Sequence, residues 1–153
     1  MRNARIALLG AGLVIVASFS GAALAQSAPA TADKWYSVAL SDNEEAFVNT
    51  NTIKAVGSQM QVRVKENYLA PRESAKKDKT YQSARTEYRV DCANRKVAML
   101  ETRAYSGSDL QGEVVQKGSR NDKNLIWMDA PRATVFGEIL DYTCKQKPAA
   151  PGG

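Results

Sequence analysis

The sequence predicts an α+β domain: an antiparallel sheet of about six strands with one C-terminal helix packed on one face and a single disulfide. Apolar and polar side chains alternate through most of residues 35–105, which is the period of half-buried strands. After Pro131 the apolar spacing changes to the three- and four-residue steps of a helical stripe. A sheet followed by a helix is typical of the α+β class.

The first two strands are short. Alternation of Tyr36, Val38 and Leu40 predicts a strand that ends in the turn-forming residues 41–43, and residues 46–49 form a second strand. The third strand is the clearest, because Met60, Val62, Val64 and Tyr68 share one face that only Glu66 interrupts. Its other face carries Gln61, Arg63, Lys65 and Asn67.

A hairpin follows an exposed, lysine-rich loop over residues 70–79. In its first strand Thr86, Tyr88, Val90 and Cys92 point one way, and Arg85, Glu87, Arg89 and Asp91 point the other way. Residues 92–95 turn the chain, and residues 96–105 return as the partner strand. A loop over 106–112 and a short strand over 113–116 complete the predicted sheet.

The helix is predicted over residues 132–144. Val135, Phe136, Ile139, Leu140 and Cys144 form its apolar stripe, which we expect to bury itself on the apolar face of the sheet.

The first 25 residues have the pattern of a cleaved signal peptide. Arg2 and Arg5 precede the apolar run 6–17, which is short for a membrane span, and a small-x-small cleavage site lies at 23–25. We therefore expect export to the periplasm or the cell exterior, although an uncleaved signal anchor is the alternative. Because no cysteine lies near the cleavage site and no later apolar run could span a membrane, we expect a mature chain without a lipid anchor or a transmembrane segment.

The expected mature chain has three parts. Residues 26–34 and 146–153 are rich in Ser, Ala, Thr, Pro and Gly, and such composition favours flexible tails around a folded domain over 35–145. Export also favours pairing of the two cysteines, Cys92 and Cys144, because an oxidising compartment promotes structural disulfides.

Composition excludes several catalytic classes. The 153 residues include no histidine, which removes the commonest general base, and two cysteines cannot form a four-thiolate zinc site. We expect no enzyme activity, no metal and no cofactor. Removal of the signal peptide leaves 19 basic and 16 acidic residues, a net charge of about +3. This small charge and the export signal argue against nucleic acid as a partner.

Basic side chains concentrate between residues 76 and 103 and form the candidate binding face. Such a face could bind an acidic glycan, lipopolysaccharide phosphates or an acidic protein, whereas the alternative is an ordinary solvated sheet surface. Alternation places two of its arginines, at 85 and 89, on one outward face. Its members are Lys76, Lys77, Lys79, Arg85, Arg89, Arg95, Lys96 and Arg103.

Several motifs resemble the bacterial surface-adhesin protein E family. They are Trp35, Phe47-Val48-Asn49-x-x-Thr52-Ile53, Tyr81-x-Ser83-x4-Tyr88-x-Val90-Asp91-Cys92, Trp127-x-x-Ala130-Pro131 and Cys144. The resemblance implies an antiparallel sheet with a helix, a disulfide between the two cysteines, and an adhesin-like role toward host matrix proteins or envelope components. The alternative function is a periplasmic structural or envelope-assembly factor that pairs through a sheet edge with a partner or a second copy.

Overall fold

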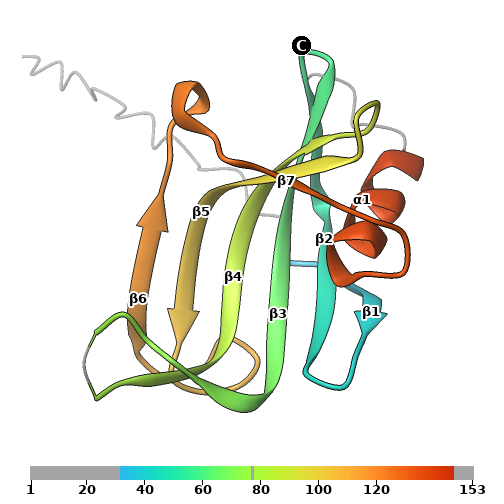
Figure 1. Cartoon of the computed structure of the whole chain (residues 1–153). Helices are drawn as coiled ribbons and strands as arrows, with labels where there is room; N and C mark the ends of the chain where they lie inside the picture. The colour runs from blue at the N-terminus through green and yellow to red at the C-terminus, as the bar shows by residue number, and fades with distance from the viewer. Residues whose placement is uncertain (1–31, 77, 147–153) are drawn as a thin grey trace, which may run out of the picture. The chain divides into compact units, whose positions relative to one another are not determined.

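The computed structural model describes residues 32–76 and 78–146, so the predicted signal peptide and most of both predicted tails lie outside the described residues. The first six strands pair antiparallel, each with the next one in the sequence, and β7 pairs with the beginning of β5 (Figure 1). The strands are β1 (Trp35–Leu40), β2 (Glu44–Val56), β3 (Gln59–Glu73), β4 (Thr80–Asp91), β5 (Lys96–Tyr105), β6 (Val114–Ser119) and β7 (Trp127–Asp129).

This sheet confirms the predicted fold class, but several strands are longer than their alternation indicates. β2 has 13 residues instead of four, because pairing with β3 continues beyond a register shift between Asn49 and Lys54. β3 extends to Glu73, which pairs with Thr80, so four residues of the predicted 70–79 loop are strand. The sequence reading also missed β7 and a 3-10 helix, η1 (Asp122–Asn124).

Helix α1 (Val135–Lys145) confirms the predicted C-terminal helix. It begins three residues later than predicted because Thr134 is its N-cap, and the Thr134 hydroxyl accepts a hydrogen bond from the Gly137 N–H at 3.1 Å. Ile139 and Leu140 are fully buried among apolar side chains of β2 to β5. No helix in the described part of the chain is long and apolar enough to cross a membrane.

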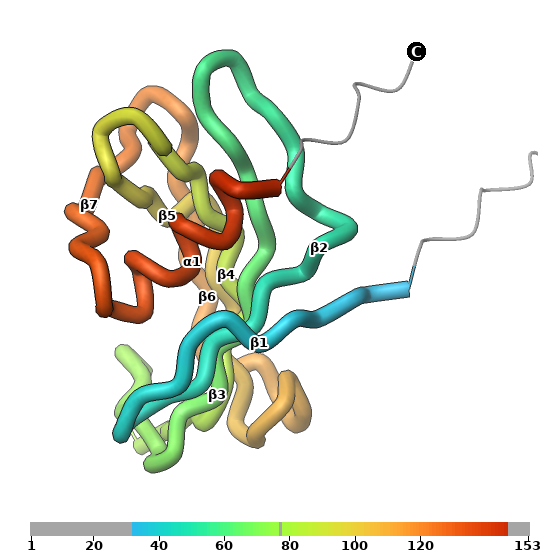
Figure 2. Tube along the Cα trace, turned by 90° about the vertical axis from the view of Figure 1, so that its right-hand side faces the viewer, coloured from blue at the N-terminus to red at the C-terminus, as the bar shows by residue number. Residues whose placement is uncertain are grey.

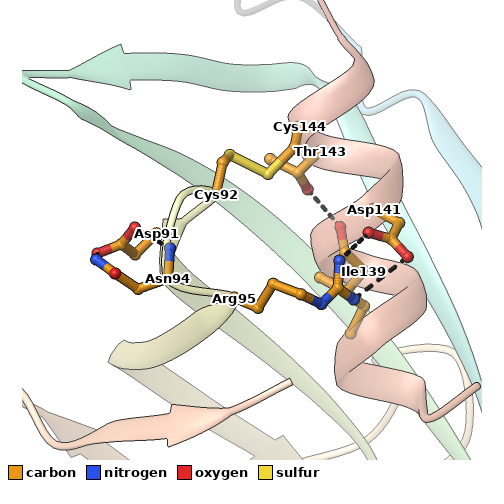
Figure 3. Close-up of a disulfide and its surroundings, with 8 residues drawn as sticks. All are labelled: Asp91, Cys92, Asn94, Arg95, Ile139, Asp141, Thr143 and Cys144. Carbon is orange, nitrogen blue, oxygen red and sulfur yellow. Dashed lines mark hydrogen bonds and ion pairs between the residues drawn. A yellow bond between two sulfur atoms is a disulfide. The ribbon is translucent and has the colours of Figure 1, made fainter. Parts of the chain in front are cut away.

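A disulfide joins the sheet to the helix, as predicted, between Cys92 and Cys144 (Figure 3). The Cα atoms are 5.9 Å apart, and the two cysteines are separated by 52 positions in the sequence. Beside it, the Arg95 guanidinium donates to both carboxylate oxygens of Asp141, at 2.6 and 3.3 Å. The turn between β4 and β5 is therefore fastened to α1 by a covalent bond and a bidentate ion pair.

The face of the sheet that packs on α1, called here the helix face, also buries one carboxyl group. Glu66 accepts hydrogen bonds from the hydroxyls of Tyr68, Thr86 and Tyr88 at 3.2 to 3.3 Å. Burial, reinforced by the nearby charge of Glu44, raises the pKa of Glu66 to about 7. The three hydroxyl donors oppose this shift but do not cancel it, so Glu66 can take up a proton near neutral pH.

Candidate functional site

The sheet surface opposite α1 is called here the polar face. It is formed by the polar side chains that alternate with apolar ones along the strands. For β3 the prediction of which residues share a face is correct, because Val62 and Val64 are buried on the helix face and the residue between them points the other way.

Two connections at the lower end of the sheet lie on opposite sides of it. The end of the β3–β4 hairpin lies on the side of α1, and the β5–β6 loop lies on the side of the polar face (Figure 2).

Four basic residues follow one another across the polar face in direct register. Lys65 on β3 is opposite Arg85 on β4, Arg85 is opposite Arg103 on β5, and Arg103 is opposite Lys117 on β6. We call these four residues the cation row. Like charges that are directly opposite on neighbouring strands destabilise a sheet, so this arrangement is unfavourable unless anions neutralise it. The cation row is therefore the candidate functional site.

Two members of the row have an internal carboxylate partner. The Lys65 ammonium forms an ion pair with Asp109 of the β5–β6 loop, and the Arg103 Nε donates to Glu101 at 2.7 Å. Among residues 32–76 and 78–146, Arg85 and Lys117 form no ion pair. These two cations are therefore the ones most available to an external anion.

The two ends of the row differ in exposure. Lys65 is only 8% exposed, and its ammonium lies 4.3 Å from the Phe47 ring centre and 5.4 Å from that of Trp35. These distances allow cation–π attraction that holds the ammonium in place. Lys117 is exposed on the edge strand β6. The row is thus closed at β3 and open to solvent at β6.

Two adjoining hollows follow the row. The first has a volume of about 160 Å³ and the second about 370 Å³, and both are lined by Glu101 and Arg103. The remaining lining residues are charged, hydroxyl-bearing or glycine: Arg63, Arg85 and Glu87 in the first hollow, and Thr102, Lys117, Gly118 and Ser119 in the second.

The two glutamates of this region, Glu87 and Glu101, form no cross-strand ion pair among the described residues. Glu87 and Glu101 are opposite each other in the sheet, so their charges repel. Glu101 pairs with Arg103 on its own strand, and Glu87 accepts a hydrogen bond from the Gln61 amide at 2.7 Å.

The prediction that Arg89 is exposed beside Arg85 is wrong. Both residues point to the polar face, but Arg89 is 6% exposed because η1 lies against it. Its guanidinium pairs with Asp122 at 2.5 Å, and its buried Nε has no hydrogen-bond partner among the described residues. Arg89 therefore cannot serve an external ligand without movement of η1.

The other predicted members of the candidate binding face are dispersed. Arg95 is committed to Asp141, Lys96 lies 3.6 Å from Asp129, and Lys79 pairs with Glu113 at 2.6 Å. Lys76 is exposed in the β3–β4 connection, and the prediction for Lys77 lies outside the described residues. Of the eight, only Arg85 and Arg103 belong to the cation row, so the predicted cluster divides into separate places.

The sequence reading omitted Lys65, Lys117 and Arg63 from the candidate binding face. Alternation had already placed Lys65 and Arg63 on the outward face of their strand, which is the signal that could have included them. Nothing local indicates that Lys65 is opposite Arg85, because register depends on how far each strand slides against its neighbour.

The sheet edges bear on the alternative of assembly by strand pairing. Among the described strands, β1, β6 and β7 each pair on one side only; β1 and β6 have six residues and β7 has three, and β1 contains an irregularity between Ser37 and Ala39. Short and irregular edges discourage strand addition. The edges therefore do not favour the assembly alternative.

Comparisons with known proteins agree with the resemblance noted in the sequence. A family model described as surface-adhesin protein E matches residues 35–145. A solved structure of Haemophilus influenzae protein E (crystal form II) is 13% identical, with a TM-score of 0.48 over 65% of this chain and 79% of that chain. Protein E from non-typeable Haemophilus influenzae is also 13% identical, with a TM-score of 0.43 over 74% and 78% of the two chains. A comparison with curated proteins finds no match.

Proposed function

We propose that this chain, which belongs to the surface-adhesin protein E family, is an exported, non-catalytic binding module that contacts an acidic partner through its cation row. The family supports a role in attachment. The observation that carries the choice of partner is the unbroken register of four cations across β3 to β6. An acidic glycan, an envelope phosphate or an acidic patch of a host matrix protein would each supply the missing negative charge.

The electrostatics of the row support reversible binding. The side chains of Arg103 and Glu101 are each about two-fifths exposed, so their ion pair is weak and can rearrange around a ligand. Arg85 lines the first hollow, where its planar guanidinium can donate two parallel hydrogen bonds to a carboxylate, sulfate or phosphate. Lys117 offers a mobile point charge at the open end.

Binding to immobilised heparin and to lipopolysaccharide vesicles, measured over a range of salt concentrations, tests this proposal. We expect binding at low ionic strength that weakens steeply with added salt, because exposed charges are screened over about 8 Å at physiological salt. The double variant Arg85→Gln, Lys117→Gln should bind roughly tenfold more weakly, since two charge contacts of up to about 1 kcal/mol each are lost.

A matched control removes the same charge elsewhere. Lys76→Gln with Lys145→Gln likewise eliminates two positive charges, and these two exposed lysines lie away from the polar face. This control should retain most of the parent affinity. Equal losses in the two double variants would show that net charge alone drives binding, and absence of binding to both probes at low salt would contradict the proposed function.

A further inference from the structure

We propose that the cation row binds a linear acidic polysaccharide lying across the strands, and that Asp109 occupies the last subsite of this row, Lys65, in the free protein. This inference rests on the proposed function and names its partner class. It is carried by the direction of the row, the lining of the hollows and the position of the β5–β6 loop.

The direction of the row favours a ligand with several charges in series. Neighbouring strands lie about 4.8 Å apart, so four residues in register on four strands span roughly 14 Å. A single small anion can contact one or two of these cations at once. A chain with repeated acidic groups that crosses the strands can contact all four, and it can enter from Lys117 at the exposed edge.

The lining of the hollows favours a polysaccharide over an acidic peptide. The side chains that line the two hollows from the polar face are Ser119 and the charged groups of Arg63, Arg85, Arg103, Lys117, Glu87 and Glu101, whereas the Thr102 hydroxyl bonds to Thr86 on the helix face. Peptide recognition by strand addition uses an open sheet edge and pockets for alternate side chains, whereas this surface lies on the face of the sheet. A sugar polymer is polar along its whole length, and groups such as the exposed Ser119 hydroxyl can hydrogen-bond its hydroxyl groups.

The Asp109 side chain places a carboxylate beside Lys65, and a carboxylate is one of the acidic groups that the ligand would carry. Its carboxylate pairs with the Lys65 ammonium, which holds the pKa of Asp109 below its usual range and keeps the carboxylate ionised. The Asp109 side chain is 64% exposed, whereas that of Lys65 is 11% exposed. Asp109 can therefore leave without disturbing the core, and its departure uncovers the fourth cation.

The backbone of the β5–β6 loop is constrained where it delivers this carboxylate. Asp109 and Leu110 both have positive φ angles, 55° and 62°, which is an unfavourable region for leucine in particular. The Asp109 N–H donates to Asn67 at 2.8 Å, and the Leu110 N–H donates to the Ser83 hydroxyl at 2.9 Å. These bonds to β3 and β4 hold the loop over the end of the row at a conformational cost, and such strain is commonly found where a segment has a binding role.

The test compares two variants that remove one negative charge from the same part of the chain. Asp109→Asn frees Lys65, and asparagine tolerates a positive φ, so the loop should keep its shape. Glu113→Gln removes an equal charge whose partner is Lys79, outside the row. Binding of heparin fragments, from disaccharide to decasaccharide, is measured at one low salt concentration for the parent and both variants.

We expect Asp109→Asn to bind the decasaccharide roughly threefold more tightly than Glu113→Gln does, a difference within the range of one exposed ion pair. The disaccharide, which is too short to span the row, should distinguish the two variants less. If the parent binds heparin but both variants behave alike with the decasaccharide, the Asp109 subsite is overturned while the proposed function stands. If polyglutamate of equal charge binds as tightly as heparin, the polysaccharide assignment is overturned. If the parent binds none of these probes, both proposals fail.

Discussion

The helix face and the polar face of the sheet are formed by alternate residues of the same strands, yet they have opposite character. Val62 and Val64 belong to the apolar core, whereas Arg63 and Lys65, their neighbours in sequence, point to the polar face. The helix face carries α1, the disulfide and one buried carboxyl group. The polar face carries the cation row with its like charges opposed. Stability therefore resides mainly on one face, which leaves the other able to tolerate an unfavourable charge pattern for recognition.

The largest expected effect concerns the disulfide and tests whether the helix face can be weakened without affecting the polar face. Cys92→Ser with Cys144→Ser should lower the free energy of unfolding by about 4 kcal/mol, because the bond closes a loop over 52 positions and restricts the unfolded chain. Urea unfolding measures the loss. At a temperature where the variant is still folded, its affinity for heparin should equal that of the parent, and a parallel loss of affinity would contradict the separation of the two faces.

The buried acid of the helix face predicts the pH dependence of stability. The pKa of Glu66 is about 7 in the folded protein and about 4.3 in an unfolded chain. Because the folded pKa is the higher one, the stabilisation is fully present below the unfolded value and is lost as the pH rises through 7. Between pH 5 and pH 8 the free energy of unfolding should fall by as much as about 3 kcal/mol.

Urea unfolding at several pH values checks this slope, and Glu66→Gln should abolish most of it. The exposed Glu138 provides the matched variant, Glu138→Gln, which should keep the slope of the parent. A parent protein that is equally stable at pH 5 and pH 8 would show that Glu66 is ionised throughout this range.

The smallest expected effect is the difference in stability between variants of two arginines of the polar face that lie four positions apart in the sequence. Arg89→Gln should cost about 2 kcal/mol, because it removes the part-buried, charged hydrogen bond that the buried Arg89 donates to Asp122. Arg85→Gln should change stability by less than about 0.5 kcal/mol, and it removes a like charge opposite Arg103. Urea midpoints of the two variants provide the measurement. Similar costs would mean that Arg85 is as much a structural residue as Arg89, which would weaken its assignment to the binding surface.

Much of the fold can be predicted from the sequence because its signals are local. Alternation along a strand decides which residues share a face, so Val62 and Val64 could be assigned to the core without knowledge of any partner strand. The apolar stripe of α1 and the turn between β4 and β5 could be predicted because their signals are local in the sequence too. The even pair of cysteines and the expected export predicted the disulfide without any structural information.

The candidate site depends on relations that no local pattern contains. Register places Lys65 and Lys117 in line with Arg85 and Arg103, and a shift of one residue would turn a whole strand's side chains to the opposite face. The placement of η1 against the sheet buries Arg89, and the β5–β6 loop brings Asp109 to Lys65 across 44 positions of sequence. The sequence by itself thus determined which face the side chains of β3 and β4 take. Only the tertiary structure decided which charges meet there, because charge pairing is set by contacts between segments that are distant in the chain.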